Sequence, residues 1–253
     1  MSKKKNYKQT AKRTIDLQIS ALSKLKKTIG NSFNDAVKII GDCKSKCILV
    51  GVGKSGHLAN LIASSLNSIG ASSFALQSAG DAAHGDLGAI STSTNKDVLI
   101  LISNSGSSSE LNPIITFSKK HGIKIIGITS KKNSALYKAA SIKILIPEVK
   151  EAGEGAFVPT SSLITQASIG SSLVIAVMQY KKHGISIFRK FHPGGALAKK
   201  LLSARDLMVK PPFISENSKM KKTLKILSEK KLGLLVVRNK KNFTSGLLVD
   251  GDV

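Results

Sequence analysis

The chain has 253 residues, of which 42% are hydrophobic and 4% aromatic, and it contains no Trp. This length can bury a large core, either as one large domain or as one domain with an appendage. The formal net charge of +24 suggests nucleic acid as a partner, but Lys outnumbers Arg, the Lys residues are scattered, and few aromatic side chains are present for base stacking. We therefore interpret the charge as a solvated basic surface that also suits phosphorylated ligands, and we expect no nucleic-acid partner.

The cysteines and the hydropathy profile indicate the cellular compartment. Cys43 and Cys47 form one C-x-x-x-C pair, which without His or further Cys is a poor zinc site and no disulfide framework. The Lys-rich N-terminus is not followed by the apolar segment of a secretory signal. We see no apolar run long enough to span a bilayer. These observations predict a cytoplasmic protein without a metal and without a membrane partner.

The hydrophobic pattern predicts an α/β fold. Apolar positions recur at helical spacing from residue 10 to residue 40, which predicts two helices separated by Gly30-Asn31, the second closed by Gly41-Asp42. Strands alternating with helices over short connections then predict a three-layer αβα sandwich around a five-stranded parallel sheet. The five strands are expected over residues 47–50, 73–76, 98–102, 125–128 and 142–146. Ligands of such sheets bind outside the carboxyl ends of the strands.

The first predicted strand runs into a glycine-rich loop, Gly51–Gly56, hereafter the Gly51 loop. It fits G-x-G-x-x-G, but the acidic residue that a dinucleotide site needs after the second strand is missing at Leu76–Ser78. It is not a Walker A loop either, because Ile48 stands where that loop requires Gly. We interpret it as a turn that aims Lys54 and Ser55 at a ligand, with Lys54 as a cation for a phosphate or a developing oxyanion.

The third predicted strand, Val98–Ile102, is followed by Ser103–Ser109, hereafter the Ser loop, and then by Glu110 and a helical pattern. Backbone N–H groups at a helix start bind anions, and small hydroxyls add donors without bulk. One or two Ser would suit an ordinary helix cap; this many, with Asn104 and Gly106, favour a phosphate site. If the first and third strands are neighbours, both loops converge on one small phosphorylated ligand.

Four acid–base candidates lie on loops: His84, Glu110, Glu151 and His192. Taken singly, a lone His is more often structural, and a Glu at a helix start is more often a capping or dipole residue. As a set beside a sugar phosphate they suit enediol chemistry, in which a base removes the proton next to the carbonyl. An acid or a cation then stabilises the enediolate oxygen.

The pattern of the remaining sequence predicts a long buried helix over residues 163–182. After residue 204 the pattern changes, which indicates a new structural segment. Pro211-Pro212 marks a break, followed by a helix over 220–230 and a pair of strands over 234–237 and 247–249. We expect two domains, residues 1–206 with N-terminal helices within 10–41, and residues 207–253.

The motifs GVGKSGH, DAAHGDLG, SNSGSSSE, KEAGEG with PTSS, and HPGGALAKKL follow one another between residues 51 and 201. Together they resemble the arabinose 5-phosphate isomerase family, built on a sugar isomerase (SIS) domain. The resemblance implies an aldose–ketose isomerase that interconverts D-ribulose 5-phosphate and D-arabinose 5-phosphate. It also implies a cytoplasmic homotetramer without an organic cofactor that feeds 3-deoxy-D-manno-octulosonate (Kdo) and lipopolysaccharide synthesis.

By position, the resemblance also implies the roles of individual residues. Glu151 is our choice for the base that moves the proton between C1 and C2. His192 would serve ring opening or proton relay, reaching into a neighbouring subunit's site, while Lys54 and His84 stabilise or orient the substrate oxygens. The implied catalytic set is Lys54, His84, Glu110, Glu151 and His192, and the implied substrate- and phosphate-binding set is Ser55, Ser103, Asn104, Ser105, Ser108, Thr160 and Ser161.

The sequence also departs from the family. Ser107 stands where the family usually carries Glu, and the His that can bind inhibitory zinc is replaced near Ser78, so no metal is expected. Residues 207–253 resemble the first of two CBS repeats and stop inside it, which argues against an adenosyl-ligand cleft of two repeats. Two alternatives stay open: a sugar-phosphate-sensing SIS domain without turnover, and an isomerase of another phosphosugar.

Overall fold

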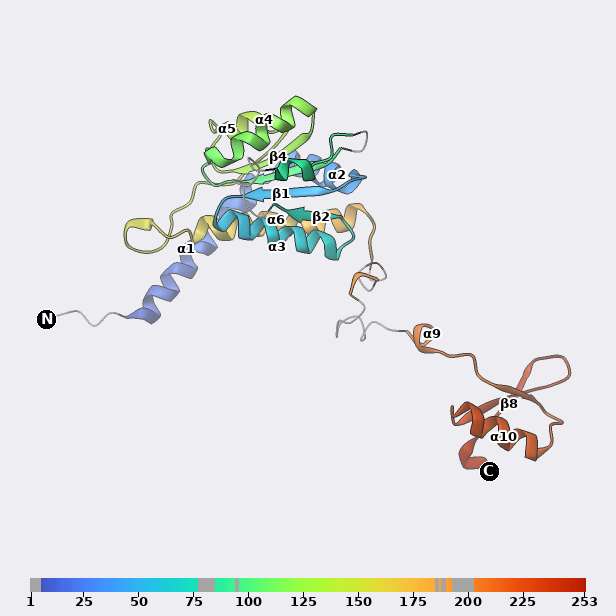
Figure 1. Cartoon of the computed structure of the whole chain (residues 1–253). Helices are drawn as coiled ribbons and strands as arrows, with labels where there is room; N and C mark the ends of the chain where they lie inside the picture. Colours follow the sequence, from blue (N-terminus) through green and yellow to red (C-terminus); the bar gives the residue numbers. More distant parts are fainter. Residues whose placement is uncertain (1–5, 77–84, 94–95, 185–186, 188–189, 193–202) are drawn as a thin grey trace. The chain divides into compact units, whose positions relative to one another are not determined.

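The computed structural model describes residues 6–76, 85–93, 96–184, 187, 190–192 and 203–253. The chain divides into two compact units, Met1–Ala198 and Lys199–Val253, which are described separately below. Figure 1 shows the elements of both units along the chain.

A five-stranded parallel sheet forms the centre of the first unit. Its strands are β1 (Cys47–Gly51), β2 (Ser73–Ala75), β3 (Val98–Ile102), β4 (Lys124–Thr129) and β5 (Ile142–Leu145). They lie in the order β2-β1-β3-β4-β5, and every pairing is parallel. All residues of β1 and β3 are buried, as runs of branched apolar residues predict for strands covered on both faces. The predicted fold class is confirmed.

Helices cover both faces of this sheet and complete the three layers (Figure 1). One face packs against α2 (Asn31–Asp42), α3 (Lys54–Ser68) and α6 (Ser161–Tyr180), with α1 (Tyr7–Thr28) against α6. The other face packs against α4 (Asn112–His121) and α5 (Ala135–Ala139). Alternate strand residues divide between the two cores, since Leu49 faces α3 and α6 whereas Ile48 faces α4 and α5.

The start of α2 differs from the one predicted. Asn31 opens the helix instead of preceding it, with Gly30 as its N-cap. Gly41 and Asp42 are the last two residues of the helix and close it as predicted, and tertiary packing explains the glycine. A Cβ on Gly41 would lie within 2.3 Å of Tyr180 Cδ1, and the Tyr180 hydroxyl donates to both carboxylate oxygens of Asp42 at 3.0 Å. Gly41 is therefore needed for the packing of α6, not for a chain reversal.

Helix α6 corrects the expectation that no run could span a bilayer. Its 20 residues have a mean hydropathy of 1.5 and pass the test by length and composition, and half of that window is buried in the protein. The buried face includes the polar side chains of Ser162, Thr165 and Gln166, and the helix packs on α1, α2 and α3. These contacts identify α6 as a core helix of the first unit.

The second unit is a small sheet with one main helix. Strand β6 (Phe213–Ser215) pairs in parallel with β7 (Leu234–Arg238), and β7 pairs antiparallel with β8 (Thr244–Val249). Helix α10 (Met220–Lys230) buries Thr223 and Leu227. Short helices occur at α9 (Ala204–Leu207) and η5 (Asp250–Asp252). The predicted helix and strand pair are confirmed, whereas the three-residue β6 was not predicted.

Candidate active site

The candidate site lies at the carboxyl ends of β1 and β3. These strands are neighbours, with Gly51 paired to Ile102, so the Gly51 loop and the Ser loop converge as predicted. The chain runs from β1 to β2 on one side and β3 lies on the other, which makes this edge the switch point where parallel sheets bind ligands. A cavity of about 420 Å³ opens there. Its lining includes Lys54, Ser55, Asn104, Glu151, Ser162 and Gln166.

The Gly51 loop brings the start of α3 against the end of β1. A Cβ on Gly51 would lie 2.5 Å from the backbone of Ser55, and one on Gly56 would lie 2.9 Å from the Gly51 carbonyl oxygen. Only glycine allows this approach, which places Lys54 as the first residue of α3 at the exposed rim of the cavity. Ser55 follows in the same turn and points inward, its hydroxyl donating to Gln166 Oε1 at 2.9 Å.

The Ser loop is held by its own hydroxyls. Ser103 Oγ accepts from the Gly106 N–H at 3.0 Å and lies 3.1 Å from Ser108 Oγ. Ser105 Oγ accepts from the Ser107 N–H at 3.3 Å. These bonds curl the loop around its own hydroxyls, a shape that suits an oxyanion.

Contacts to β4 and α5 fix the loop from outside. The Asn104 carbonyl accepts from Ser130 N at 3.1 Å and Ser130 Oγ at 2.8 Å. Gly106 has φ +62°, and a Cβ there would lie 2.2 Å from Ser134 Oγ. These contacts fix the position of the loop against β4 and α5, and Asn104 is the member of the loop that lines the cavity.

Glu110 lies outside the cavity lining. The chain after the Ser loop first makes a 3₁₀ turn, η3 (Ser109–Leu111), and α4 begins only at Asn112. Glu110 sits in that turn with an exposed side chain, and its Oε2 accepts from Ser109 Oγ at 3.3 Å. Pro113 lies in the first turn of α4, a position that suits proline.

Glu151 enters the cavity from the loop after β5. Its Oε2 accepts from Thr160 N at 2.7 Å, Thr160 Oγ1 at 2.9 Å and Ser162 N at 3.3 Å. Burial raises the pKa of this carboxyl, but the hydrogen bonds from Ser162 and Thr160 outweigh burial, so the pKa lies below its usual value. Glu151 is thus a carboxylate at neutral pH. All its hydrogen bonds within the described residues fall on one oxygen.

Two predicted substrate-binding residues lie behind the cavity wall. Thr160 is bound to Glu151, and its Oγ1 also accepts from Ala152 N at 2.8 Å. Ser161 is fully buried, and its hydroxyl has no hydrogen-bond partner among the described residues. Neither lines the cavity; Thr160 orients Glu151 instead.

Of the two predicted histidines, His192 falls among the described residues and His84 does not. His84 falls within residues 77–84, outside the described part of the chain. His192 follows Phe191, whose ring lies against Gly70. Gly70 comes just after α3 ends, whereas Lys54 begins α3, and a helix of this length spans about 22 Å. His192 therefore neighbours the opposite edge of the sheet within its own unit.

Two lining residues escaped the sequence analysis, Ser162 and Gln166. They lie four residues apart in α6 and so share one helix face. Both are at most 3% exposed, and Gln166 joins α6 to the Gly51 loop through Ser55. The available signal was the long polar side chain of Gln166, four residues after Ser162, in a helix predicted to be largely buried.

The lining offers hydroxyls, amides, one ammonium and one carboxylate. Such a set can bind a phosphorylated sugar by hydrogen bonds and charge. Among the residues that the structure describes, no three His, Cys, Asp or Glu side chains gather as metal ligands. Cys43 and Cys47 are free thiols, half-buried and buried respectively.

Comparison with known sequences identifies a matching family and similar proteins. Residues 39–176 match the SIS domain. The chain is 35% identical over 251 residues to an uncharacterized protein of Rickettsia prowazekii, with 98% of this chain and 77% of that protein covered. It is 32% identical over 252 residues to the arabinose 5-phosphate isomerase KdsD of Escherichia coli K12, with 98% of this chain and 76% of KdsD covered.

Solved structures with a similar fold include a sugar-phosphate complex of a related protein. The Escherichia coli CFT073 protein c3406 in complex with arabinose 5-phosphate is 30% identical, with a TM-score of 0.68 over 72% of this chain and 95% of that one. The Vibrio vulnificus NanR protein complexed with ManNAc-6P is 16% identical, with a TM-score of 0.60 over 79% of this chain and 70% of that one, and shares the fold alone. We conclude that the chain belongs to the SIS domain family and, within it, to the arabinose 5-phosphate isomerase family of enzymes.

Proposed function

We propose that the chain interconverts D-ribulose 5-phosphate and D-arabinose 5-phosphate through an enediol. The observation that carries the proposal is the shared cavity, where the Ser loop and the Gly51 loop meet one ionised carboxylate, Glu151. The family relationship to KdsD and c3406 supports this choice of substrate. Phosphate would bind at Ser55, Ser103, Asn104, Ser105 and Ser108, supported from behind by Thr160 and Ser161.

Proton transfer is assigned to Glu151. In the open-chain aldose its carboxylate takes the proton from C2, and the carbonyl electrons move to O1 to give the enediolate. Lys54, at the rim of the same cavity, stabilises that oxygen. A proton passes from O2 to O1, and protonated Glu151 returns its proton to C1, which leaves the ketose with its carbonyl at C2. His84 and Glu110 complete the proposed catalytic set as groups that orient the sugar oxygens.

His192 is proposed to act in the site of another copy. Its neighbour Phe191 packs at the edge of the sheet opposite the cavity. We therefore propose that a second subunit supplies the imidazole to each site. We propose a homotetramer, which the exposed apolar residues Ile15, Ile19 and Leu22 of α1 support. Each site would then use Glu151 of one copy and His192 of another.

The proposed setting is the cytoplasm, where the product would feed Kdo and lipopolysaccharide synthesis. No nucleic acid, membrane or organic cofactor takes part in the proposed reaction. We further propose that residues 1–206 form the isomerase domain and that residues 207–253 form a CBS-like segment.

Incubation with D-ribulose 5-phosphate in the presence of a metal chelator tests the proposal. Formation of D-arabinose 5-phosphate, and of the ketose in the reverse direction, is the expected result. Binding of the phosphosugar without conversion would overturn the enzyme assignment in favour of a sensor. Conversion of a hexose phosphate in place of these pentoses would instead make it an isomerase of another phosphosugar.

A further inference from the structure

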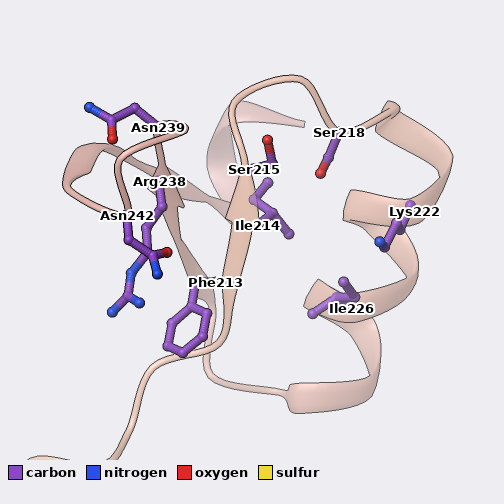
Figure 2. A pocket seen from close by; sticks show the side chains of 9 residues that line it. All are labelled: Phe213, Ile214, Ser215, Ser218, Lys222, Ile226, Arg238, Asn239 and Asn242. Carbon is purple, nitrogen blue, oxygen red and sulfur yellow. The ribbon is translucent and has the colours of Figure 1, made fainter.

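The second unit contains a cavity of about 290 Å³ that the proposed isomerase reaction does not use (Figure 2). It lies where the parallel strands β6 and β7 end, beside the first turn of α10. Ile214, Ile226 and the ring of Phe213 supply apolar surface. The polar side chains come from both sides, as Figure 2 shows: Ser215, Ser218 and Lys222 on one, and Arg238, Asn239 and Asn242 on the other.

The charge of this cavity is positive and uncompensated. Lys222 and Arg238 line it together, and none of the described residues that line it is acidic. Within the described residues of this unit, the ion pair present is Lys225–Glu229, which involves neither cation. Lys222 is also the third residue of α10, so the partial positive charge of the helix N-terminus falls on the same side. Three sources of positive potential therefore meet in one small space.

Arg238 is held ready for a ligand. Its guanidinium carbon lies 3.8 Å from the centroid of the Phe213 ring, a stacking contact that fixes the plane of the group. Its Nε is buried and has no hydrogen-bond partner in the part of the chain that the structure describes. A buried donor left unpaired is costly, so an acceptor oxygen at this position would be favoured.

The neighbouring side chains also offer donors. Asn239 Oδ1 already accepts from Lys241 N at 3.0 Å and Phe243 N at 3.1 Å, which leaves its amide N–H₂ group to donate. Lys222 and Arg238 can only donate. A ligand suited to this set carries several acceptor oxygens and a double negative charge at one end.

We propose that this cavity binds a small phosphate monoester, with its phosphate between Lys222 and Arg238 and its apolar part against Ile214 and Ile226. The volume is at the lower end of the range for ligand cavities, which limits the ligand to about the size of one ring. The site is separate from the sugar-phosphate cavity, since its lining residues all belong to the second unit.

The test uses the full chain, containing ¹⁵N-labelled arginine, and phenyl phosphate as the probe. The sequence contains only four arginines, Arg13, Arg189, Arg205 and Arg238, and Arg238→Lys identifies the Nε–H signal of interest. Phenyl phosphate should shift that signal along a saturating curve. Lys222→Gln should weaken binding about tenfold, as for loss of a charged hydrogen bond. Lys221→Gln removes the same charge next to the site, outside its lining, and should leave the affinity within about twofold.

Two results would overturn the proposal. One is a shift that grows linearly and is matched by sodium chloride at equal ionic strength, since it would reflect screening alone. The other is an equal effect of Lys221→Gln and Lys222→Gln. The outcome is independent of the isomerase assignment, because the signal belongs to Arg238 and turnover of D-ribulose 5-phosphate is measured separately.

Discussion

At the scale of single residues, Glu151 is the most informative side chain. It accepts three hydrogen bonds at the start of α6 and also lines the candidate active site. The capping hydrogen bonds all end on Oε2, and proton abstraction also requires an ionised carboxylate, so one residue can serve both roles. The two roles separate experimentally, because capping affects the free energy of unfolding whereas base catalysis affects turnover.

Replacement of Glu151 by Gln should lower kcat by about 10²–10⁴-fold, the usual contribution of a general base. The amide keeps the shape of the side chain and can still accept a hydrogen bond, so binding of the sugar phosphate should persist. Steady-state kinetics with D-ribulose 5-phosphate, together with calorimetric binding, measures both quantities. Glu154→Gln alters an exposed carboxylate in the same loop, outside the cavity lining, and should retain full turnover. Unchanged kcat in Glu151→Gln would remove Glu151 from the role of base.

Stability should depend on pH through the same carboxyl. The pKa of Glu151 is lowered on folding, so the ionised form stabilises the protein at pH values above the ordinary Glu pKa. This stabilisation is lost as pH falls through the lowered pKa. Near neutral pH, the free energy of unfolding of the wild type should exceed that of Glu151→Gln by about 1 kcal/mol, as for loss of a helix cap. The difference should shrink in acid, as denaturant unfolding curves at several pH values would reveal. A pH-independent difference would indicate that the carboxylate charge is not what matters.

At the scale of elements, the strands and the Ser loop were predictable because their signals are local. Runs such as Val98–Ile102 predict strands buried on both faces. All five predicted strands of the first unit appear in its sheet. The errors arose where tertiary contacts decide. The contact of Tyr180 with Gly41 depends on the approach of α6, and β6 forms after Pro211-Pro212 because β7 offers it a partner.

The site was partly predictable for the same reason. Lys54, Ser55, Asn104 and Glu151 occupy loops at strand ends and were brought together. Gln166 was missed because its role depends on the approach of α6 to the Gly51 loop, a tertiary contact that its position in the helix does not reveal. Glu110 was placed beside the phosphate from its position in the chain, and its catalytic role stays a prediction.

The rigidity of the Ser loop predicts a sharp effect at Gly106. Gly106→Ala places a Cβ within 2.2 Å of Ser134 Oγ at a φ of +62°. It should destabilise the protein by more than about 1 kcal/mol and weaken phosphate binding. Gly88→Ala is the matched control, because a Cβ there meets no atom of the described residues within 4 Å. Thermal unfolding and binding of inorganic phosphate give the readout. Equal behaviour of the two variants would argue against a loop fixed by β4 and α5.

At the scale of the whole molecule, the exposed apolar face of α1 predicts self-association. Ile15, Ile19 and Leu22 lie on one face of α1, and their exposed fractions are 54%, 57% and 36%. Ile15→Ser combined with Ile19→Ser should reduce the molar mass measured by light scattering while leaving the helical circular dichroism unchanged. Lys24→Ser, on the same helix, should keep the assembly of the wild type. A monomeric wild type would refute the proposed oligomer directly.

In the proposed oligomer His192 links assembly to catalysis, and subunit mixing distinguishes two arrangements. Glu151→Gln and His192→Asn should each be inactive alone. If each site combines Glu151 of one copy with His192 of another, an equimolar co-refolded mixture contains some sites with both native residues, about a quarter for random assembly. If His192 served the site of its own chain, every site would carry one defect, and mixing would restore nothing. Recovery of about a quarter of wild-type activity is therefore expected, since Phe191 holds the neighbouring histidine near Gly70, at the edge of the sheet opposite the cavity.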